Sequence, residues 1–500
     1  MPRVRNFLIA AVCMLALPGF VQQRRTLVIQ PAEATVEVGK SVTFRALLDG
    51  KVVTPRWTVN SPGVATVAAD GTVTGRSVGK ARIFARTKNI DAFADITVVS
   101  STDPTPPPSP PPGSNRGPQS TIVCPSGATS ISPGESLKTL IETGAPFICI
   151  KAGVHQVTAS ITPRTGQTII GEYSAILDGT GWTTSDETAA AFRCTAGNAA
   201  TDVTIKNLII RNMPKKGIYD AETCFRWSID NNEIHNSQWG AIVTAGSLLR
   251  ANRLHHNGQG VNGGNYNVYV TAQYGSTMCT LLENNEIAYG GVEQKAMNTG
   301  CVNWRNNWVH HNDRDGIWND GEGNGGIIEG NLVEDNARTG IHIELSYGFI
   351  VRNNTVRRSG DQAIMLSTSR DNRVENNILE DNFRGLAIFL SCGSMLQSWP
   401  WKPDLSNNLL INNSVLVGTS PSGQIAAYFS TTSDCSARDA QGNLLFDVTP
   451  YLDGTKNNRF ESNKYAVPDI NASWWLWNGW RNWAQWQGLG HDVNGTMILR

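Results

Sequence analysis

The chain has 500 residues, which is more than one hydrophobic core usually holds, so at least two domains are expected. Its 42 basic and 42 acidic residues cancel, and this balance removes the basic surface expected of a nucleic-acid-binding protein. The charge balance says nothing more about the partner.

The N-terminus predicts an export signal. Arg3 and Arg5 precede an almost wholly apolar segment, 7–20, which is too short for a comfortable membrane span. We therefore expect a signal peptide over residues 1–26 and a protein that a bacterial-type pathway secretes or places on the cell surface. No later segment is long and apolar enough to span a membrane.

Nine cysteines occur in the chain, and eight remain once Cys13 in the signal is set aside. An even number in an exported chain indicates disulfides, and no Cys-x-x-Cys or Cys/His spacing indicates a metal site. Each consecutive pair spans about one or two of the repeats described below. We therefore predict these pairs: Cys124–Cys149, Cys194–Cys224, Cys279–Cys301 and Cys392–Cys435.

Residues 27–100 predict an antiparallel β-sandwich, because apolar residues alternate, as in 36–38 and 96–98, between frequent turns. "LVIQPAEATVEVGKSVTFRALLDGKVV" and "WTVNSPGVATVAADGTVTGRSVGKARIFA" resemble a bacterial immunoglobulin-like domain of group 2. That resemblance implies a spacer or adhesion module on a secreted or surface protein.

The Pro-rich segment 101–120 predicts an extended linker between this module and the rest of the chain. Because the linker separates the two parts, we expect the main activity not to need residues 27–100. A chain that begins near residue 118 should then fold and act alone.

From about residue 121 the sequence repeats. Asn followed two residues later by a branched apolar residue recurs 20 to 33 residues apart, starting at Asn207, Asn232, Asn252, Asn285, Asn307, Asn331, Asn354, Asn377 and Asn408. A period in this range predicts a solenoid, and short β-rich segments without a recurring helix favour a right-handed parallel β-helix over 121–470. The asparagines should stack at the bends, where their amides form a hydrogen-bonded ladder.

The pattern resembles the secreted pectate-lyase-like β-helix superfamily, so the expected fold class is all-β. In the Trp-rich tail, 471–500, "WAQWQGLGHDVNG" resembles the closing segment of secreted β-helix proteins that act on polysaccharides. Trp483 and Trp486, three residues apart, predict a helix that caps the open end of the solenoid.

One face of the solenoid concentrates reactive side chains. Gly316, Gly340 and Ala363 each lie nine residues after an anchor asparagine, so the isoleucines that follow them should stack in the core. Strand side chains alternate between faces. Two outward rows result, the first with Trp318, His342 and Met365 and the second with Asp320, Glu344 and Ser367.

Two earlier coils extend these rows, with Tyr269 and Thr271 in one and Glu293 and Lys295 in the other. Asp320 then lies beside Glu344, and stacked like charges are unfavourable unless a proton, a cation or Lys295 relieves them. An ordinary solvated face is the alternative, but the acids together with Trp318 favour a site.

Three functions fit this face. In a glycoside hydrolase, Asp320 and Glu344 would be the catalytic pair, His342 would tune the acid, and an extracellular polysaccharide would be held by Trp318, Tyr269, Glu293 and Glu322. No cofactor is needed for that reaction.

The second function is a lyase or epimerase that acts on uronate polymers, with Lys295 or His342 as the base. The substrate carboxylate would be neutralised by Arg314, Arg338 or a Ca²⁺ ion bound by Asp320, Glu322 and Glu344. The third is a surface adhesin that binds glycans without catalysis.

Overall fold

The computed structural model describes residues 26–87, 90–99, 115–194, 197, 199–220, 224–258, 265–271, 277–292, 294–297, 300–321, 323–397, 403–418, 424–439 and 441–500. The predicted signal peptide, apart from Thr26, and most of the predicted linker lie outside these residues. The chain divides into two compact units, Met1–Ser109 and Pro110–Arg500.

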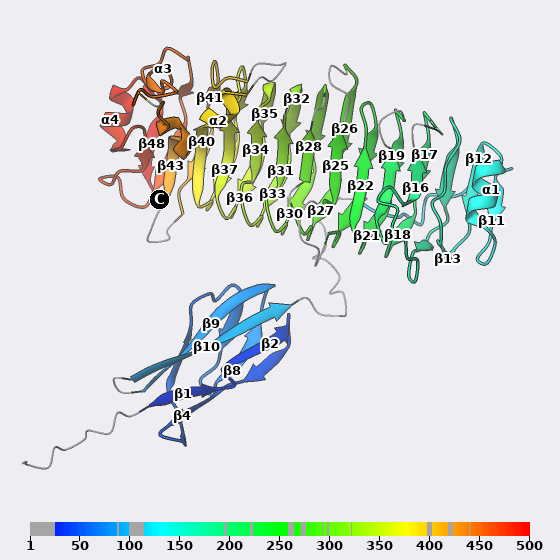
Figure 1. The fold of residues 1–500 in the computed structure, drawn as a ribbon, viewed down its shortest axis with the longest axis horizontal. Helices are drawn as coiled ribbons and strands as arrows, with labels where there is room; N and C mark the ends of the chain where they lie inside the picture. The colour runs from blue at the N-terminus through cyan, green and yellow to red at the C-terminus, as the bar shows by residue number, and fades with distance from the viewer. Residues whose placement is uncertain are drawn as a thin grey trace, which may run out of the picture. The chain divides into compact units, whose positions relative to one another are not determined.

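The first unit is a small β-sandwich of three sheets, and its alternating strands bury Phe44, Ile83 and Ile96 between them (Figure 1). The strands are β1 (Leu27–Gln30), β2 (Glu33–Glu37), β3 (Ser41–Thr43), β4 (Arg45–Leu48), β5 (Lys51–Val53), β6 (Arg56–Val59), β7 (Ala65–Val67), β8 (Thr72–Gly75), β9 (Gly79–Thr87) and β10 (Ile90–Val99).

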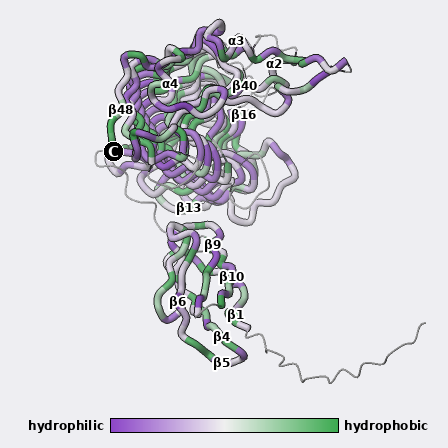
Figure 2. Tube along the Cα trace, turned by 90° about the vertical axis from the view of Figure 1, so that its left-hand side faces the viewer, coloured by the Kyte–Doolittle hydropathy of each residue, from purple (hydrophilic) through white to green (hydrophobic). Residues whose placement is uncertain are grey.

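The second unit is a parallel β-helix, in which each complete coil gives one strand to each of three sheets, and successive coils superpose along the long axis (Figures 1 and 2). Sheet 1 contains β11 (Thr129–Ile131), β12 (Phe147–Ile150), β14 (Thr168–Gly171), β17 (Thr204–Lys206), β20 (Ser228–Asp230), β23 (Leu248–Arg250), β26 (Cys279–Glu283), β29 (Cys301–Arg305), β32 (Asn324–Glu329), β35 (Tyr347–Arg352), β38 (Arg373–Glu375), β41 (Leu409–Ile411) and β44 (Arg459–Glu461).

Sheet 2 contains β13 (Gly153–Gln156), β15 (Ala175–Asp178), β18 (Ile209–Arg211), β21 (Glu233–His235), β24 (Arg253–His255), β27 (Glu286–Ala288), β30 (Trp308–His310), β33 (Leu332–Glu334), β36 (Thr355–Arg357), β39 (Ile378–Glu380), β42 (Ser414–Leu416), β45 (Lys464–Val467) and β48 (Thr496–Leu499). Sheet 3 contains β16 (Ala190–Cys194), β19 (Lys216–Asp220), β22 (Trp239–Val243), β25 (Val268–Thr271), β28 (Gln294–Met297), β31 (Ile317–Asp320), β34 (Ile341–Glu344), β37 (Gln362–Ser367), β40 (Arg384–Leu390), β43 (Ile425–Thr431), β46 (Trp475–Leu476) and β47 (Trp480–Arg481).

Short helices accompany the coils: α1 (Leu137–Thr143), α2 (Cys392–Met395), the 3-10 helix η1 (Ser433–Ser436), α3 (Thr449–Leu452) and α4 (Trp483–Gly488). The predicted helix at Trp483 is thus confirmed as α4. Trp486 is fully buried there and packs on Phe460 and Trp475 at the end of the solenoid. Among the described residues, no helix is long and apolar enough to span a membrane.

Buried asparagines form the predicted ladder between sheets 1 and 2. Asn307 Oδ1 accepts the backbone N–H of Asn285 at 2.9 Å and its side-chain N–H at 3.0 Å. Asn331 Oδ1 accepts the same two groups of Asn307 at the same distances. The prediction was wrong at both ends of the series. Asn207 Oδ1 accepts the backbone N–H of Gln119, and Asn408 belongs to a parallel series with Asn372, while Asn413 continues the main ladder.

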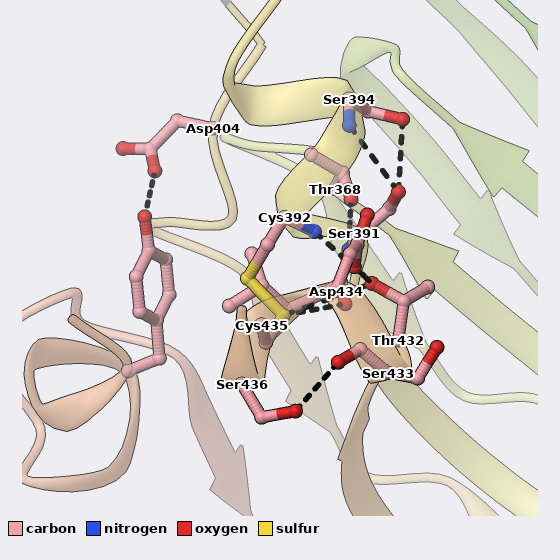
Figure 3. The surroundings of a disulfide bond; sticks show 12 residues. Thr368, Ser391, Cys392, Ser394, Asp404, Thr432, Ser433, Asp434, Cys435 and Ser436 are labelled. Atoms are coloured by element: carbon pink, nitrogen blue, oxygen red, sulfur yellow. Dashed lines mark hydrogen bonds between the residues drawn. A yellow bond between two sulfur atoms is a disulfide. The ribbon is translucent and has the colours of Figure 1, made fainter. Parts of the chain in front are cut away.

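All four predicted disulfides are confirmed: Cys124–Cys149, Cys194–Cys224, Cys279–Cys301 and Cys392–Cys435. The last one joins α2 to η1 across neighbouring coils, with hydroxyl groups around it (Figure 3). Stacking explains the sequential pairing, because it brings cysteines from nearby coils next to one another, as with Cys279 and Cys301 on the paired strands β26 and β29.

Residues 115–120, at the end of the predicted linker, lie against the β-helix as a strap. Arg116 Nε donates to the carbonyl oxygen of Asn284 at 2.8 Å and Nη2 to that of Asn306 at 3.3 Å. The backbone N–H of Gly117 donates to the carbonyl oxygen of Ala251 at 2.7 Å. The strap therefore contacts several successive coils, which lie more than 100 residues after it in the sequence.

We expect a chain that begins at residue 112 to fold like the full protein, whereas one that begins at 118 should melt about 2–5 °C lower, because it lacks Arg116 and its hydrogen bonds. Differential scanning calorimetry of both chains measures this. Arg116→Ala in the longer chain should reproduce the loss. Equal melting temperatures for all three would show that the strap does not stabilise the β-helix.

Candidate functional site

Sheet 3 carries the reactive side chains that the sequence placed on one face. Strands β31 and β34 pair in parallel, with Trp318 opposite His342 and Asp320 opposite Glu344. Strand β37 continues both rows with Met365 and Ser367, and the isoleucines that precede the first row are buried in the core. Figure 1 shows these three strands next to one another. The predicted register of these coils is confirmed.

One coil earlier the predicted register was wrong by two residues. Lys295 lies opposite Trp318 and Met297 opposite Asp320, where Glu293 and Lys295 had been expected. The reason is that the polar Gln294 takes the core position opposite Ile317, where the apolar Val292 had been expected. Its amide oxygen accepts the backbone N–H of Val268 at 3.0 Å, and its amide N–H donates to a buried asparagine. A shift of two residues keeps each side chain on its predicted face, so alternation alone does not reveal it.

Lys295, Trp318 and His342 form a column along the axis of the solenoid. The ammonium nitrogen of Lys295 lies 3.6 Å from the centre of the Trp318 ring. The His342 ring stacks on the same indole from the following coil, with centroids 5.6 Å apart and an angle of 7° between planes. Both faces of Trp318 are therefore occupied, which leaves only its edge for a ligand and differs from the expected role as a sugar platform.

The two neighbouring carboxyl groups have different partners. Asp320 forms an ion pair with Lys295, with 2.7 Å between Oδ2 and Nζ. Glu344 Oε2 instead accepts a hydrogen bond from the indole N–H of Trp318 at 3.0 Å. The exposed fractions of the Asp320 and Glu344 side chains are 15% and 25%. Asp320 thus contacts an ammonium directly, whereas the hydrogen-bond donor to Glu344 is neutral.

Asp315 is a site residue that the sequence did not identify. Its Oδ2 lies 3.0 Å from Nδ1 of His342, and both residues are buried. On the other side of the ring, Nε2 of His342 lies 3.8 Å from Glu344 Oε2. Asp315 directly precedes the Gly316–Ile317 pair that marks the repeat, but it lies in a bend, where strand alternation does not give the direction of a side chain.

Burial and charge shift the pKa values of these groups. Burial raises the pKa of Glu344; the charge of His342 opposes this, and the negative charge of Asp320 adds to it. Burial lowers the pKa of His342, but its hydrogen bond to Asp315 and the charge of Glu344 outweigh this, so the pKa lies above its ordinary value. Glu344 therefore holds a proton to a higher pH than an ordinary glutamic acid, and His342 is favoured in its cationic form.

The remaining predicted site residues lie at the margin or outside the described residues. Tyr269 lies opposite Lys295, and its hydroxyl donates to the sulfur of Met297 at 3.4 Å. Burial, then the charge of Asp320, raises the pKa of Tyr269. Glu293 and Glu322 lie outside the described residues. Six of the eight predicted residues therefore share this face.

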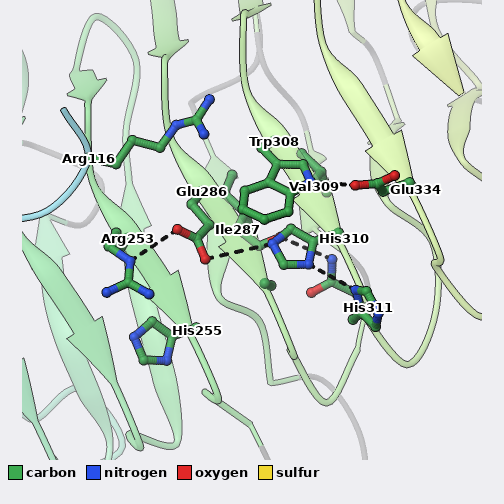
Figure 4. Close-up of polar contacts among 12 residues, drawn as sticks. Arg116, Arg253, His255, Glu286, Ile287, Trp308, Val309, His310, His311 and Glu334 are labelled. Atoms are coloured by element: carbon green, nitrogen blue, oxygen red, sulfur yellow. Dashed lines mark hydrogen bonds and ion pairs between the residues drawn. The ribbon is translucent and has the colours of Figure 1, made fainter. Parts of the chain in front are cut away.

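A histidine cluster on sheet 2 was not predicted (Figure 4). The Nδ1 atoms of His255 and His256 lie 2.8 Å apart, and Glu233 Oε1 lies 2.9 Å from Nε2 of His255. His235 stacks on His255, with ring centroids 5.0 Å apart. His310 and His311 repeat the pairing two coils later at 2.9 Å.

This cluster predicts a loss of stability in mild acid. Burial, then the neighbouring His255, lowers the pKa of His235 and of His256 to about 4. Below about pH 6.5 these histidines bind protons in the unfolded chain but stay neutral in the folded one. Their contribution to the free energy of unfolding is therefore fully present above that pH and is lost between pH 6.5 and 4. Each histidine contributes up to about 1.4 kcal/mol per pH unit.

Melting temperatures between pH 7.5 and 4.5 measure this loss. His256 has a positive φ of 54°, a conformation that asparagine also adopts readily, so His256→Asn should fold and show a weaker pH dependence. An unchanged pH profile in this variant would exclude His256 as a source of the acid sensitivity.

Comparisons with known proteins match both parts of the chain. The model of the bacterial Ig-like domain (group 2) matches residues 26–98, as the sequence resemblance implied. The model of a family described as periplasmic copper-binding protein (NosD) matches residues 257–443. No curated protein sequence matches the chain.

Several solved structures resemble the chain at low sequence identity. The A-module of mannuronan C-5 epimerase AlgE6 from Azotobacter vinelandii has a TM-score of 0.49 and 14% identity, over 72% of this chain and 93% of that one. The surface adhesin PfbA of Streptococcus pneumoniae has a TM-score of 0.41 and 10% identity, over 61% and 93%. The catalytic unit of a GH87 alpha-1,3-glucanase from Streptomyces thermodiastaticus has a TM-score of 0.38 and 12% identity, over 78% and 76%.

The three stacked sheets and the asparagine ladder identify the second unit as a parallel β-helix. The match over residues 26–98 identifies the first unit. The chain is a right-handed parallel β-helix protein with an N-terminal bacterial Ig-like domain of group 2.

Proposed function

We propose that the protein is an exported glycoside hydrolase that cleaves an extracellular polysaccharide, with Glu344 as the proton donor and Asp320 as the nucleophile. The observation that carries the proposal is the pair of neighbouring carboxyl groups with different partners, an ammonium for Asp320 and an indole N–H for Glu344. Adjacent strands are about 4.8 Å apart, and a retaining hydrolase needs its two carboxyl groups about 5–5.5 Å apart.

In this reaction Asp320 attacks the anomeric carbon while the glycosidic C–O bond breaks. The leaving oxygen takes the proton of Glu344, and a glycosyl ester on Asp320 results. Glu344, now a carboxylate, removes a proton from water, and that water attacks the anomeric carbon and releases Asp320. Burial of Glu344 supports the first role, because a raised pKa keeps a donor protonated near neutral pH.

The lyase or epimerase alternative needs a neutral base to remove a proton beside the substrate carboxylate. Lys295 is engaged by Asp320, and the contacts of His342 favour its cation. Both observations support hydrolysis over elimination. Arg338, a candidate neutraliser, has its Nε 3.9 Å from Asp315 Oδ1, which also argues against a free role toward a substrate carboxylate. A Ca²⁺ ion enters only in the lyase alternative.

Export is supported by the four disulfides, since disulfides persist in oxidising compartments outside the cytoplasm. Attachment to the cell surface, with the Ig-like domain as a spacer, is part of the same proposal.

Product analysis on a panel of neutral and uronate polysaccharides tests the proposal. A hydrolase releases reducing sugars without ultraviolet absorbance, and a retaining mechanism gives products with the original anomeric configuration in early NMR spectra. Unsaturated uronates would instead establish a lyase. An unchanged chain length with inverted uronate residues in the NMR spectrum would establish an epimerase, and binding without cleavage or inversion would establish an adhesin.

A further inference from the structure

Asp315 heads a buried hydrogen-bond network behind the reactive face. Its Oδ1 accepts the backbone N–H of Thr339 at 3.0 Å, while its Oδ2 faces Nδ1 of His342 at 3.0 Å. The Thr339 hydroxyl donates to Gln362 Oε1 at 2.8 Å, and the Gln362 amide donates to the Tyr428 hydroxyl at 2.5 Å. The network thus crosses several coils of sheet 3.

Every member of this network is buried, with exposed fractions from 2% for Thr339 to 7% for His342. A buried network of this kind fixes side-chain positions, because any rotation leaves a donor or acceptor without a partner. Since both oxygens of Asp315 are occupied, its carboxylate has one orientation. That orientation requires a proton on Nδ1 of His342.

The other ring nitrogen is in the opposite situation. Nε2 of His342 is buried, has no hydrogen-bond partner among the described residues, and lies 3.8 Å from Glu344 Oε2. Because Trp318 stacks on the ring at 7°, the imidazole plane is also fixed. A buried polar atom without a partner lowers the stability of the fold, so it is usually kept only where it has a function. The direction of Nε2 toward Glu344 suggests that function.

We propose that Asp315 is the positioning residue of this site. It holds a proton on Nδ1 of His342 and directs Nε2 toward Glu344, and so controls the charge of the imidazole next to the carboxyl group of Glu344. This rests on the proposed function for the role of Glu344. The position of the His342 proton can be measured without any substrate.

The charged groups around His342 define what its titration reports. Arg338 precedes its own strand, and Asp315, Lys295 and Asp320 come from the preceding coils. Glu344 lies on the same strand as His342, Asp361 lies just before β37, and Arg384 is the first residue of β40. Asp315 makes the only direct side-chain hydrogen bond to His342 that the described residues contain, so its removal should have the largest effect.

Nitrogen-detected NMR titration of the His342 ring tests the proposal, with His342→Gln used to assign its signals among the eight histidines. We expect Nδ1 to carry the proton when the ring is neutral, and Asp315→Asn to lower the titration midpoint by at least one pH unit. Asp361→Asn is the matched control: it breaks the ion pair of Asp361 with Arg384 at 2.7 Å and should leave the midpoint unchanged.

Two results would overturn the proposal: a neutral ring with its proton on Nε2, or a folded Asp315→Asn protein with the midpoint of the wild type. The first is measured on the wild type, so it decides the matter even if the variant does not fold. If no polysaccharide is cleaved, the proposed function fails, but the titration still decides the role of Asp315. If one is cleaved, Asp315→Asn should lower kcat and shift the pH profile with little change in KM.

Discussion

Replacing Glu344 by Gln is expected to lower kcat on a polysaccharide about 10²- to 10⁴-fold, the usual contribution of a general acid. The amide cannot donate a proton to the leaving oxygen, although it keeps the size of the side chain and can still accept from the indole N–H of Trp318. Substrates with a good leaving group, such as aryl glycosides, need no proton in the first step and should recover much of kcat/KM, whereas release of the glycosyl ester stays slow because it needs Glu344 as the base.

Asp320→Asn should lose activity on both kinds of substrate, because no glycosyl ester can form.

In the wild type, activity should fall on the alkaline side as Glu344 loses its proton, and burial moves this fall to a higher pH than for an ordinary glutamic acid. Initial rates across pH measure both effects.

The matched control for these variants is Glu329→Gln. Glu329 forms ion pairs with Arg305 and Arg352 on sheet 1, away from the reactive face. It should keep its full rate and lose no more than about 1 kcal/mol of stability. Wild-type rates in the Glu344 and Asp320 variants would show that this face is only a solvated surface.

Replacing Asn377 by Ala is expected to destabilise the β-helix by about 3–5 kcal/mol. Its Oδ1 accepts the backbone N–H of Asn354 at 3.0 Å and its side-chain N–H at 2.9 Å. Its own amide donates to Val351 O and to Asn413 Oδ1, both at 2.9 Å. All of these groups are buried, and alanine removes the acceptor of both Asn354 N–H groups and the donor to Val351 O, while Asn413 Oδ1 keeps only the backbone N–H of residue 377.

Asn376→Gly is the matched control for Asn377→Ala. Asn376 is the neighbouring residue and is exposed, and its φ of 56° is a conformation that glycine adopts without strain. Its variant should melt close to the wild type, whereas the Asn377 variant should melt roughly 5–10 °C lower, given the size of the protein. Similar melting temperatures for the two variants would show that the ladder contributes little.

The sequence by itself determined the solenoid, its asparagine ladder and the four disulfides. A parallel β-helix makes this possible, because every coil buries the same positions of its strands. The same residue types therefore recur at nearly constant spacing. Where the spacing was regular, from Asn307 to Asn377, the register followed to the residue. Stacking then places cysteines of nearby coils together without further information.

Only the tertiary structure decided the details of the candidate site. Gln294 takes the core position opposite Ile317 because a buried amide partner is available to it there, and this two-residue shift places Lys295 on the indole face of Trp318 that was expected to hold a sugar. Asp315 lies in a bend and meets His342 from the next coil, a contact that no periodicity encodes. Alternation fixes which side of a strand a residue faces, but the partner of a charged group depends on side chains that converge from different coils.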